Sequence, residues 1–148
     1  MKLMYDLPAQ DEQVYQSLAS PGENKLYCIP FDYLDGHRVS GFMLMTDVAV
    51  YKLLAGKLLE RWPLTDLSGL TTEVMYGSGA LYGKVKGHST MLCQFNTGRN
   101  LPRYSLMVTA FDRYEEDGLK TAMTSDEPER HCPKCGRPFM AGTKVCPF

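Results

Sequence analysis

Seven short apolar runs separated by turn signals constrain the fold of this chain more than any other feature. The runs occupy residues 25–34, 40–47, 48–54, 57–62, 70–76, 80–86 and 90–96. Asp35-Gly36, Ala55-Gly56, Gly77-Ser78-Gly79 and Gly87-His88-Ser89 separate some of the runs, and Pro63 ends the fourth. Such dipeptides between β-rich runs are hairpin signals. The pattern predicts an antiparallel meander that must close into a barrel or pack as two sheets to hide its edges.

Alternation inside the runs predicts which side chains face a core. One predicted face is Leu70, Thr72, Val74 and Tyr76, and another is Met91, Cys93 and Phe95. Antiparallel strands typically have one apolar face that packs on the core and one polar face exposed to solvent.

The period of the apolar residues changes after residue 100. A helical stripe follows at Tyr104, Met107, Val108, Phe111 and Tyr114. This spacing predicts an amphipathic helix over residues 101–117, with Asn100 as its N-cap and Gly118 as its stop. A second, shorter helix is predicted at residues 10–19, where Pro21-Gly22 ends it.

Seven antiparallel strands followed by one amphipathic helix form the layout of the pleckstrin-homology (PH) superfold. The segment 41–47, with Thr46-Asp47 at its end and Tyr51 beyond, resembles bacterial PH-like domains. We therefore expect a mainly β chain: a PH-like seven-stranded antiparallel barrel capped by a C-terminal helix. Its predicted extent is residues 1–118, followed by a linker at 119–130, a stretch with few large apolar side chains.

Residues 131–148 have the spacing of an incomplete zinc ribbon. Cys132-Pro-Lys-Cys135-Gly is a zinc knuckle, and Cys146-Pro-Phe begins a second one. A structural zinc site is tetrahedral with four ligands. We therefore predict zinc ligation by Cys132, Cys135 and Cys146, together with a cysteine expected at position 149. His131 adjoins Cys132 and is poorly placed to chelate the same ion.

The other two of the five cysteines, Cys28 and Cys93, stand among apolar strand residues. Buried thiols of this kind are inert. His88 precedes Cys93 in a turn, so a cysteine–histidine nucleophile is a weaker alternative. The basic side chains Lys84, Lys86, Arg99 and Arg103 are expected to be solvated rather than to hold a lipid phosphate.

Composition excludes several broad classes. The formal net charge is −1, with 44% hydrophobic and 22% charged residues. A general nucleic-acid or anionic-membrane binder would be strongly basic. The sequence contains no 18-residue apolar run. Its start, Met1 to Pro8, has no apolar core long enough for a signal peptide, so none is expected. An odd cysteine count with a zinc knuckle indicates a reducing compartment.

Three passages in order resemble one family. They are Tyr5-Asp6-Leu7-Pro8, then Leu92-Cys93-Gln94-Phe95 leading to Arg103-Tyr104, then the ribbon from Cys132 to Pro147. They are similar to the cytosolic N-terminal region of ABC transporters of Firmicutes, Clostridia in particular, which fuse permease and ATPase in one chain. The resemblance implies a non-catalytic regulatory domain at the cytosolic face of an exporter, with the permease and ATPase downstream as partners and a homodimer formed through the parent transporter.

Two other classes stay open. A free-standing adaptor would bind protein or nucleic acid through its ribbon, although the balanced charge disfavours nucleic acid as a partner. An enzyme would use Cys93 or Cys28 as a nucleophile, although their apolar neighbours disfavour it.

Overall fold

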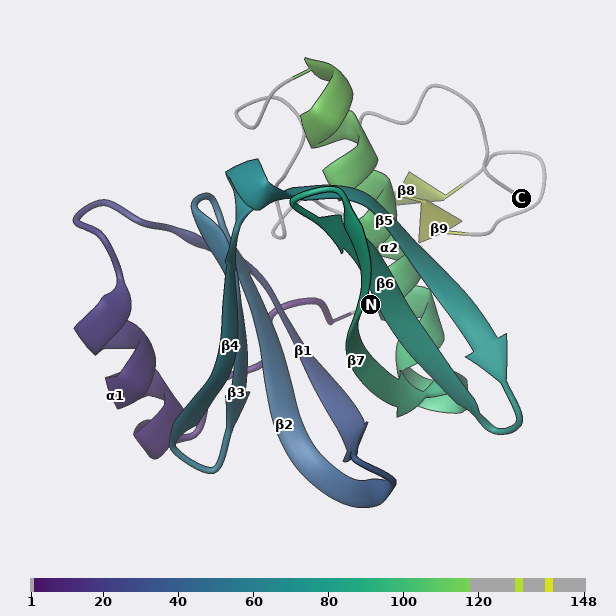
Figure 1. Cartoon of the computed structure of the whole chain (residues 1–148), viewed down its shortest axis with the longest axis horizontal. Coiled ribbons are helices and arrows are strands. Elements are labelled where there is room, and N and C mark those ends of the chain that lie inside the picture. The colour runs from purple at the N-terminus through teal and green to yellow at the C-terminus, as the bar shows by residue number, and fades with distance from the viewer. Residues whose placement is uncertain (1, 118–129, 132–137, 140–148) are drawn as a thin grey trace.

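A computed structural model describes residues 2–117, 130–131 and 138–139 of the chain (Figure 1). The predicted pattern of strands and helices is confirmed, with small shifts of the bounds. The elements are α1 (Ala9–Leu18), β1 (Lys25–Leu34), β2 (His37–Thr46), β3 (Ala49–Leu54), β4 (Lys57–Pro63), the 3₁₀ turn η1 (Leu64–Asp66), β5 (Leu67–Met75), β6 (Ser78–Val85), β7 (His88–Asn96), α2 (Thr97–Asp117), β8 (Arg130–His131) and β9 (Pro138–Phe139).

The hairpin turns follow the predicted dipeptides. Asp35 and Gly36 have φ of 50° and 81°, and Ala55 and Gly56 have φ of 50° and 80°. Two consecutive positive φ angles match the right-handed twist of the flanking strands, which is why such turns join hairpins tightly.

The seven strands form one antiparallel sheet in the order β4-β3-β2-β1-β7-β6-β5. The ladder between β1 and β7 is reduced to the pair Tyr33–Gln94. Within the described residues no ladder joins β4 to β5, so these two strands are the edges. The sheet is therefore open, and the closed hydrogen-bonded barrel expected from the sequence is not seen.

The N-terminal segment forms backbone hydrogen bonds with β1 along part of the edge that β7 does not pair with. Cys28 N–H donates to the carbonyl of Leu3, and Tyr5 N–H donates to the carbonyl of Cys28, both at 2.9 Å. Arg103 Nε in α2 donates to the carbonyl of Lys2 at 2.9 Å. The segment thus extends the sheet at the point where β1 and β7 have separated.

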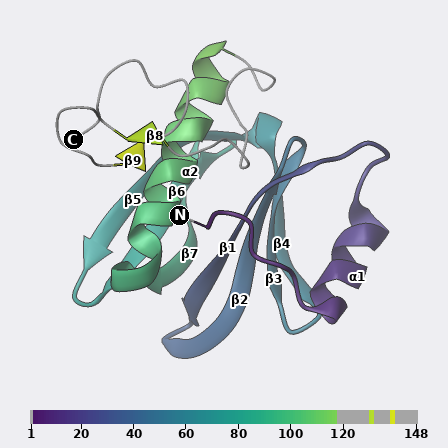
Figure 2. The same ribbon diagram turned by 180° about the vertical axis from the view of Figure 1, so that it is seen from behind.

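The two helices cover opposite sides of the sheet (Figures 1 and 2). The larger core lies between the sheet and α2, where the rings of Phe95 and Tyr104 stack with centroids 4.4 Å apart. The smaller core lies under α1, where Tyr15 meets Tyr51 edge to face. The predicted α2 stripe is confirmed for Tyr104, Met107 and Phe111, which are fully buried.

Two details of the sequence prediction are wrong. The helix begins at Thr97, and Asn100 lies inside it instead of capping it. The Asn96 side chain accepts the N–H of Arg99 at 3.3 Å, which is the bond an N-cap residue makes. The predicted face of β5 is also incomplete, because Leu70 is buried while Val74 and Tyr76 are 63% and 106% exposed. The hairpin of β5 and β6 extends beyond the body that α2 covers (Figure 1).

Candidate functional site

The two strand cysteines lie inside the protein. Cys28 and Cys93 are 0% and 1% exposed, and burial raises the pKa of each thiol to about 12. A thiol in this state is not a nucleophile near neutral pH. His88 is exposed at the start of β7, five positions before Cys93, roughly 16 Å along a strand. The structure therefore does not bring this cysteine and histidine together.

The Thr46-Asp47 motif holds the loop before β1. Glu23 accepts hydrogen bonds from the hydroxyl of Tyr51 at 2.7 Å and from that of Thr46 at 2.8 Å. Asp47 accepts the N–H of Asn24 at 2.9 Å. These residues, which carried the resemblance to PH-like domains, thus stabilise the connection between α1 and the sheet.

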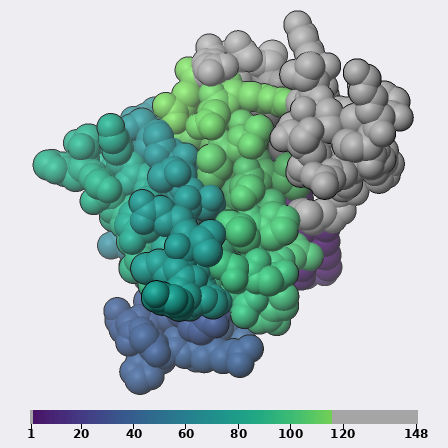
Figure 3. All heavy atoms as spheres, turned by 90° about the vertical axis from the view of Figure 1, so that its right-hand side faces the viewer, coloured from purple at the N-terminus to yellow at the C-terminus, as the bar shows by residue number. Residues whose placement is uncertain are grey.

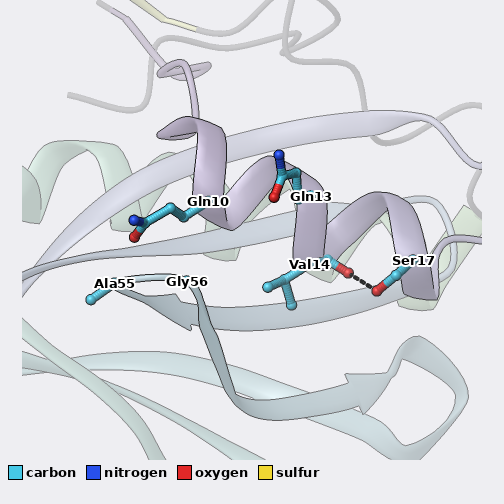
Figure 4. Close-up of a pocket in the computed structure, with 6 residues that line it drawn as sticks. All are labelled: Gln10, Gln13, Val14, Ser17, Ala55 and Gly56. Carbon is cyan, nitrogen blue, oxygen red and sulfur yellow. Dashed lines mark hydrogen bonds between the residues drawn. The ribbon is translucent and has the colours of Figure 1, made fainter.

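A surface hollow of about 440 Å³ lies between α1 and the β3–β4 turn (Figure 4). Its lining is Gln10, Gln13, Val14, Ser17, Ala55 and Gly56. Beneath it the Asp11 carboxylate, 1% exposed, accepts the N–H of Gly56 at 2.7 Å. The polar groups here are amides and a hydroxyl, which carry no charge, and the Ser17 hydroxyl donates to the carbonyl of Val14 at 2.7 Å.

A second hollow, of about 380 Å³, lies beside the end of α1 and is lined by Tyr15, Glu23 and Lys25 among others. Lys25 forms an ion pair with Glu12. Burial opposes ionisation of Glu12, but the hydrogen bonds from Lys25 and Gln16 prevail and lower its pKa. The Tyr15 hydroxyl is buried without a hydrogen-bond partner in the described part of the chain. The charges of this hollow are thus already engaged within the fold.

A third hollow, of about 510 Å³, follows β1 and β2 and is lined in part by Phe31, Asp32, Arg38 and Arg99. Asp32 is 8% exposed and accepts an ion-pair hydrogen bond from Arg99 at 3.2 Å. Its other oxygen accepts the N–H of Asn96 at 2.7 Å. This is the largest of the three hollows, and Pro30, Phe31, Val39 and Phe42 add apolar lining, but its acid is engaged in joining β1 to α2.

Sequence reasoning missed the role of Asp32. One available signal was its position as a single acid within the apolar run 25–34. The structure adds that the register of β1 against β2 shifts between Phe31 and Tyr33. A residue at such an irregularity can turn its side chain away from the regular alternation.

The four basic side chains weighed in the sequence do not converge. Lys84 and Lys86 lie near the β6–β7 turn, whereas Arg99 and Arg103 lie at the start of α2. The two groups are at opposite ends of β7. Arg99 pairs with Asp32, and Arg103 hydrogen-bonds to backbone carbonyls. No single basic anion site forms from these four residues.

The predicted zinc ligands Cys132, Cys135 and Cys146 lie outside the described residues. Strands β8 and β9 flank the first two of them, with Arg130 opposite Phe139 and His131 opposite Pro138. Among the residues that the structure does describe, no group of three histidine, cysteine or acidic side chains could hold a metal ion.

The part of the chain that is described is thus a mainly β domain, an open seven-stranded antiparallel sheet with a C-terminal helix. Within it no helix is long and apolar enough to cross a membrane. Searches of protein-family models, of curated proteins and of solved structures found no match to the chain.

Proposed function

We propose that this chain is a non-catalytic, PH-like accessory module of an ABC-type membrane exporter, located at the cytosolic face. Its partners would be the permease and ATPase domains that follow in the same polypeptide. The ribbon cysteines would hold one structural zinc between the module and those domains.

The proposal that the module is non-catalytic rests on one observation: its thiols are buried, and its buried or partly buried acids are hydrogen-bonded within the fold. Both strand thiols are buried with raised pKa values, and Asp11, Glu23 and Asp32 each bind backbone or hydroxyl donors of the fold. Groups committed to structural hydrogen bonds in this way are poor acids, bases or nucleophiles because catalysis would break those bonds. A module of this kind acts by binding and positioning.

The strand order supports the PH-like assignment. Strands β1–β4 form one continuous meander, β5–β7 form another, and β1 and β7 join them through the single ladder pair Tyr33–Gln94. Helix α2 follows β7 directly and packs against β5, β1, β7 and β6. This is the order in which a PH domain arranges two half-sheets and a terminal helix.

The zinc assignment stays a prediction from cysteine spacing. Three thiolates suit zinc chemically, and a fourth ligand is required for a closed tetrahedral site. The pairing of β8 with β9 makes the residues before Cys132 and after Arg137 neighbours, as a knuckle turn requires.

An antiserum raised against the purified chain tests whether this module is part of a longer membrane protein. On immunoblots of fractionated source cells, we expect it to detect a membrane-associated polypeptide far longer than 148 residues, retained after an alkaline carbonate wash. A polypeptide of about this length in the soluble fraction would reject the exporter and favour the alternative, a free-standing adaptor that uses its ribbon to bind protein or nucleic acid.

A further inference from the structure

A buried hydroxyl without a partner lines the second hollow, beside the end of α1. Tyr15 is 2% exposed, and its hydroxyl has no hydrogen-bond partner in the described part of the chain. The ring is held in place, because Tyr51 meets it edge to face and the Lys25 ammonium lies 5.2 Å from its centroid. A buried polar group without a partner is costly and rare in native proteins. The hydroxyl is therefore available to a molecule that enters the hollow.

The hollow has room for a small ligand. Its volume is about 380 Å³, within the range of small-molecule sites. Besides Tyr15, its lining residues are Gln16, Ala19, Ser20, Pro21, Gly22, Glu23 and Lys25. They come from the end of α1, the loop that follows it and the start of β1, so a ligand there would contact all three. This is the α1 side of the molecule, whereas α2 and the β5–β6 hairpin lie on the side that faces the viewer in Figure 3.

The charges nearest to this hydroxyl are mainly negative. Burial raises the pKa of Tyr15, and the carboxylates of Glu23, Asp47 and Glu12 raise it further. Lys25 offsets the charge of Glu12, with which it forms an ion pair. A group that binds the hydroxyl is therefore favoured if it is a cation and disfavoured if it is an anion.

Glu23 keeps its charge although its oxygens are hydrogen-bonded. Oε2 accepts from the hydroxyls of Tyr51 and Thr46, which are neutral. Oε1 accepts the N–H of Ser20 at 3.1 Å, and a carboxylate oxygen can accept a further bond. Arg61 lies over the Tyr51 ring at 5.4 Å and offsets part of this negative charge. With Lys25 and Arg61 each offsetting one acid, the third carboxylate keeps the balance negative.

We propose that this hollow binds the protonated amino group of a small primary amine, which donates hydrogen bonds to the hydroxyl of Tyr15 and the carboxylate of Glu23. An ammonium group has three donors and requires no closed set of ligands. A divalent metal ion such as Ca²⁺ needs about six to eight oxygen ligands, more than one hydroxyl and one carboxylate supply. The body of the amine would lie against Ala19, Pro21 and Gly22. The site does not depend on the exporter context, so either proposal can fail without the other.

Titration of the full chain with methylammonium chloride, followed by its backbone amide signals in two-dimensional NMR, tests this. At constant ionic strength, we expect saturable shifts of the amides in residues 16–25, the segment that borders the hollow. Tetramethylammonium chloride supplies the same charge but no N–H donor, so it should not cause these shifts. Potassium chloride supplies a bare cation and should not cause them either.

Tyr15→Phe removes the proposed acceptor. It should raise the dissociation constant of methylammonium more than about tenfold, because hydrogen bonds to charged groups are the stronger ones. The ligand-free variant should melt no lower than the unaltered chain, since the lost hydroxyl had no partner among the described residues. Tyr76→Phe is the matched control, because it removes the same hydroxyl from a residue that is 106% exposed on the β5–β6 hairpin. It should leave the dissociation constant unchanged.

Lys25→Gln tests the role of charge. Glutamine removes a like charge from the hollow and leaves the Glu12 carboxylate without its ion pair. The dissociation constant of methylammonium should therefore fall about 2–5-fold at low salt, and the gain should shrink as salt is added. A rise of the constant in this variant would contradict the negative balance of charge on which the proposal rests.

Three other outcomes would overturn the proposal. The absence of saturable shifts up to roughly 200 mM methylammonium would leave water as the partner of the Tyr15 hydroxyl. Equal shifts with tetramethylammonium or potassium would exclude recognition through N–H donors. Binding that Tyr15→Phe does not weaken would place the amine elsewhere on the protein.

Discussion

Removal of the Asp32 carboxylate should lower the free energy of unfolding strongly for so small a group, because three residues donate hydrogen bonds to it. One oxygen accepts the N–H of Asn96 at 2.7 Å and the side-chain amide of Asn100 at 2.9 Å. The other accepts from Arg99 at 3.2 Å. Together these bonds attach the start of α2 to β1.

Asp32→Ala would leave the two amide donors without an acceptor. A buried donor left unsatisfied costs about 1–3 kcal/mol, and Asn100 is 3% exposed. The Arg99 ion pair adds at most about 1 kcal/mol, because the Arg99 side chain is 61% exposed and solvent screens it. The free energy of unfolding should therefore fall by about 3–4 kcal/mol, within the 5–15 kcal/mol typical of a domain.

Asp32→Asn is the matched control. The asparagine oxygen can occupy the position where both amide donors converge, so only the ion pair with Arg99 is lost. We expect a fall of about 1 kcal/mol. The difference of about 2–3 kcal/mol between the two variants measures the two amide bonds alone.

Urea unfolding followed by Trp62 fluorescence and by circular dichroism measures these changes. Trp62 is the only tryptophan and is buried in β4, so its emission reports on the sheet. Coincidence of the two signals checks two-state behaviour. A loss below about 1 kcal/mol in Asp32→Ala, or equal losses in both variants, would refute the argument. A double-mutant cycle with Asn100→Ala should give a coupling of about 1–2 kcal/mol.

Three further predictions concern the core, the thiols and the metal. Phe111→Ala should destabilise the chain by about 3–5 kcal/mol in the same assay, because the ring is fully buried under the sheet, whereas exposed Thr109→Ala should cost under about 0.5 kcal/mol. Cys28 and Cys93 should resist native-state alkylation detected by mass spectrometry, and rapid modification of either with the fold intact would revive the enzyme hypothesis. Because folding raises the pKa of both thiols from 9.0 to about 12, the unfolded chain loses protons first and stability should fall above pH 9, by about 2–3 kcal/mol at pH 10. Replacing both by alanine should reduce that decline, and the part that is left comes from Tyr15, Tyr51 and Tyr104, whose pKa values burial also raises. A chain extended past position 149 should bind one zinc per chain and lose it to a chelator, and an extended chain that purifies without metal and binds none when zinc is added would reject the ribbon.

Local periodicity was enough to predict the strands and helices of this protein. The turn dipeptides, such as Asp35-Gly36, tolerate the positive φ that a tight hairpin turn needs, so the turns could be placed from the residues alone. The apolar stripe of α2 likewise depends on the 3.6-residue period of a helix. Burial of Cys28 and Cys93 followed from their strand neighbours for the same reason.

Long-range contacts decided the rest. The start of α2 moved to Thr97 because Asn96 caps it, and Asn100 instead binds Asp32 in β1, 68 positions away in the sequence. Alternation in β5 could say that Val74 shares a face with Leu70, but not that α2 leaves Val74 uncovered. The exposed β5 edge and the open sheet depend on which elements pack together, and that choice is set by the whole chain because segments far apart in sequence must bury each other's surfaces.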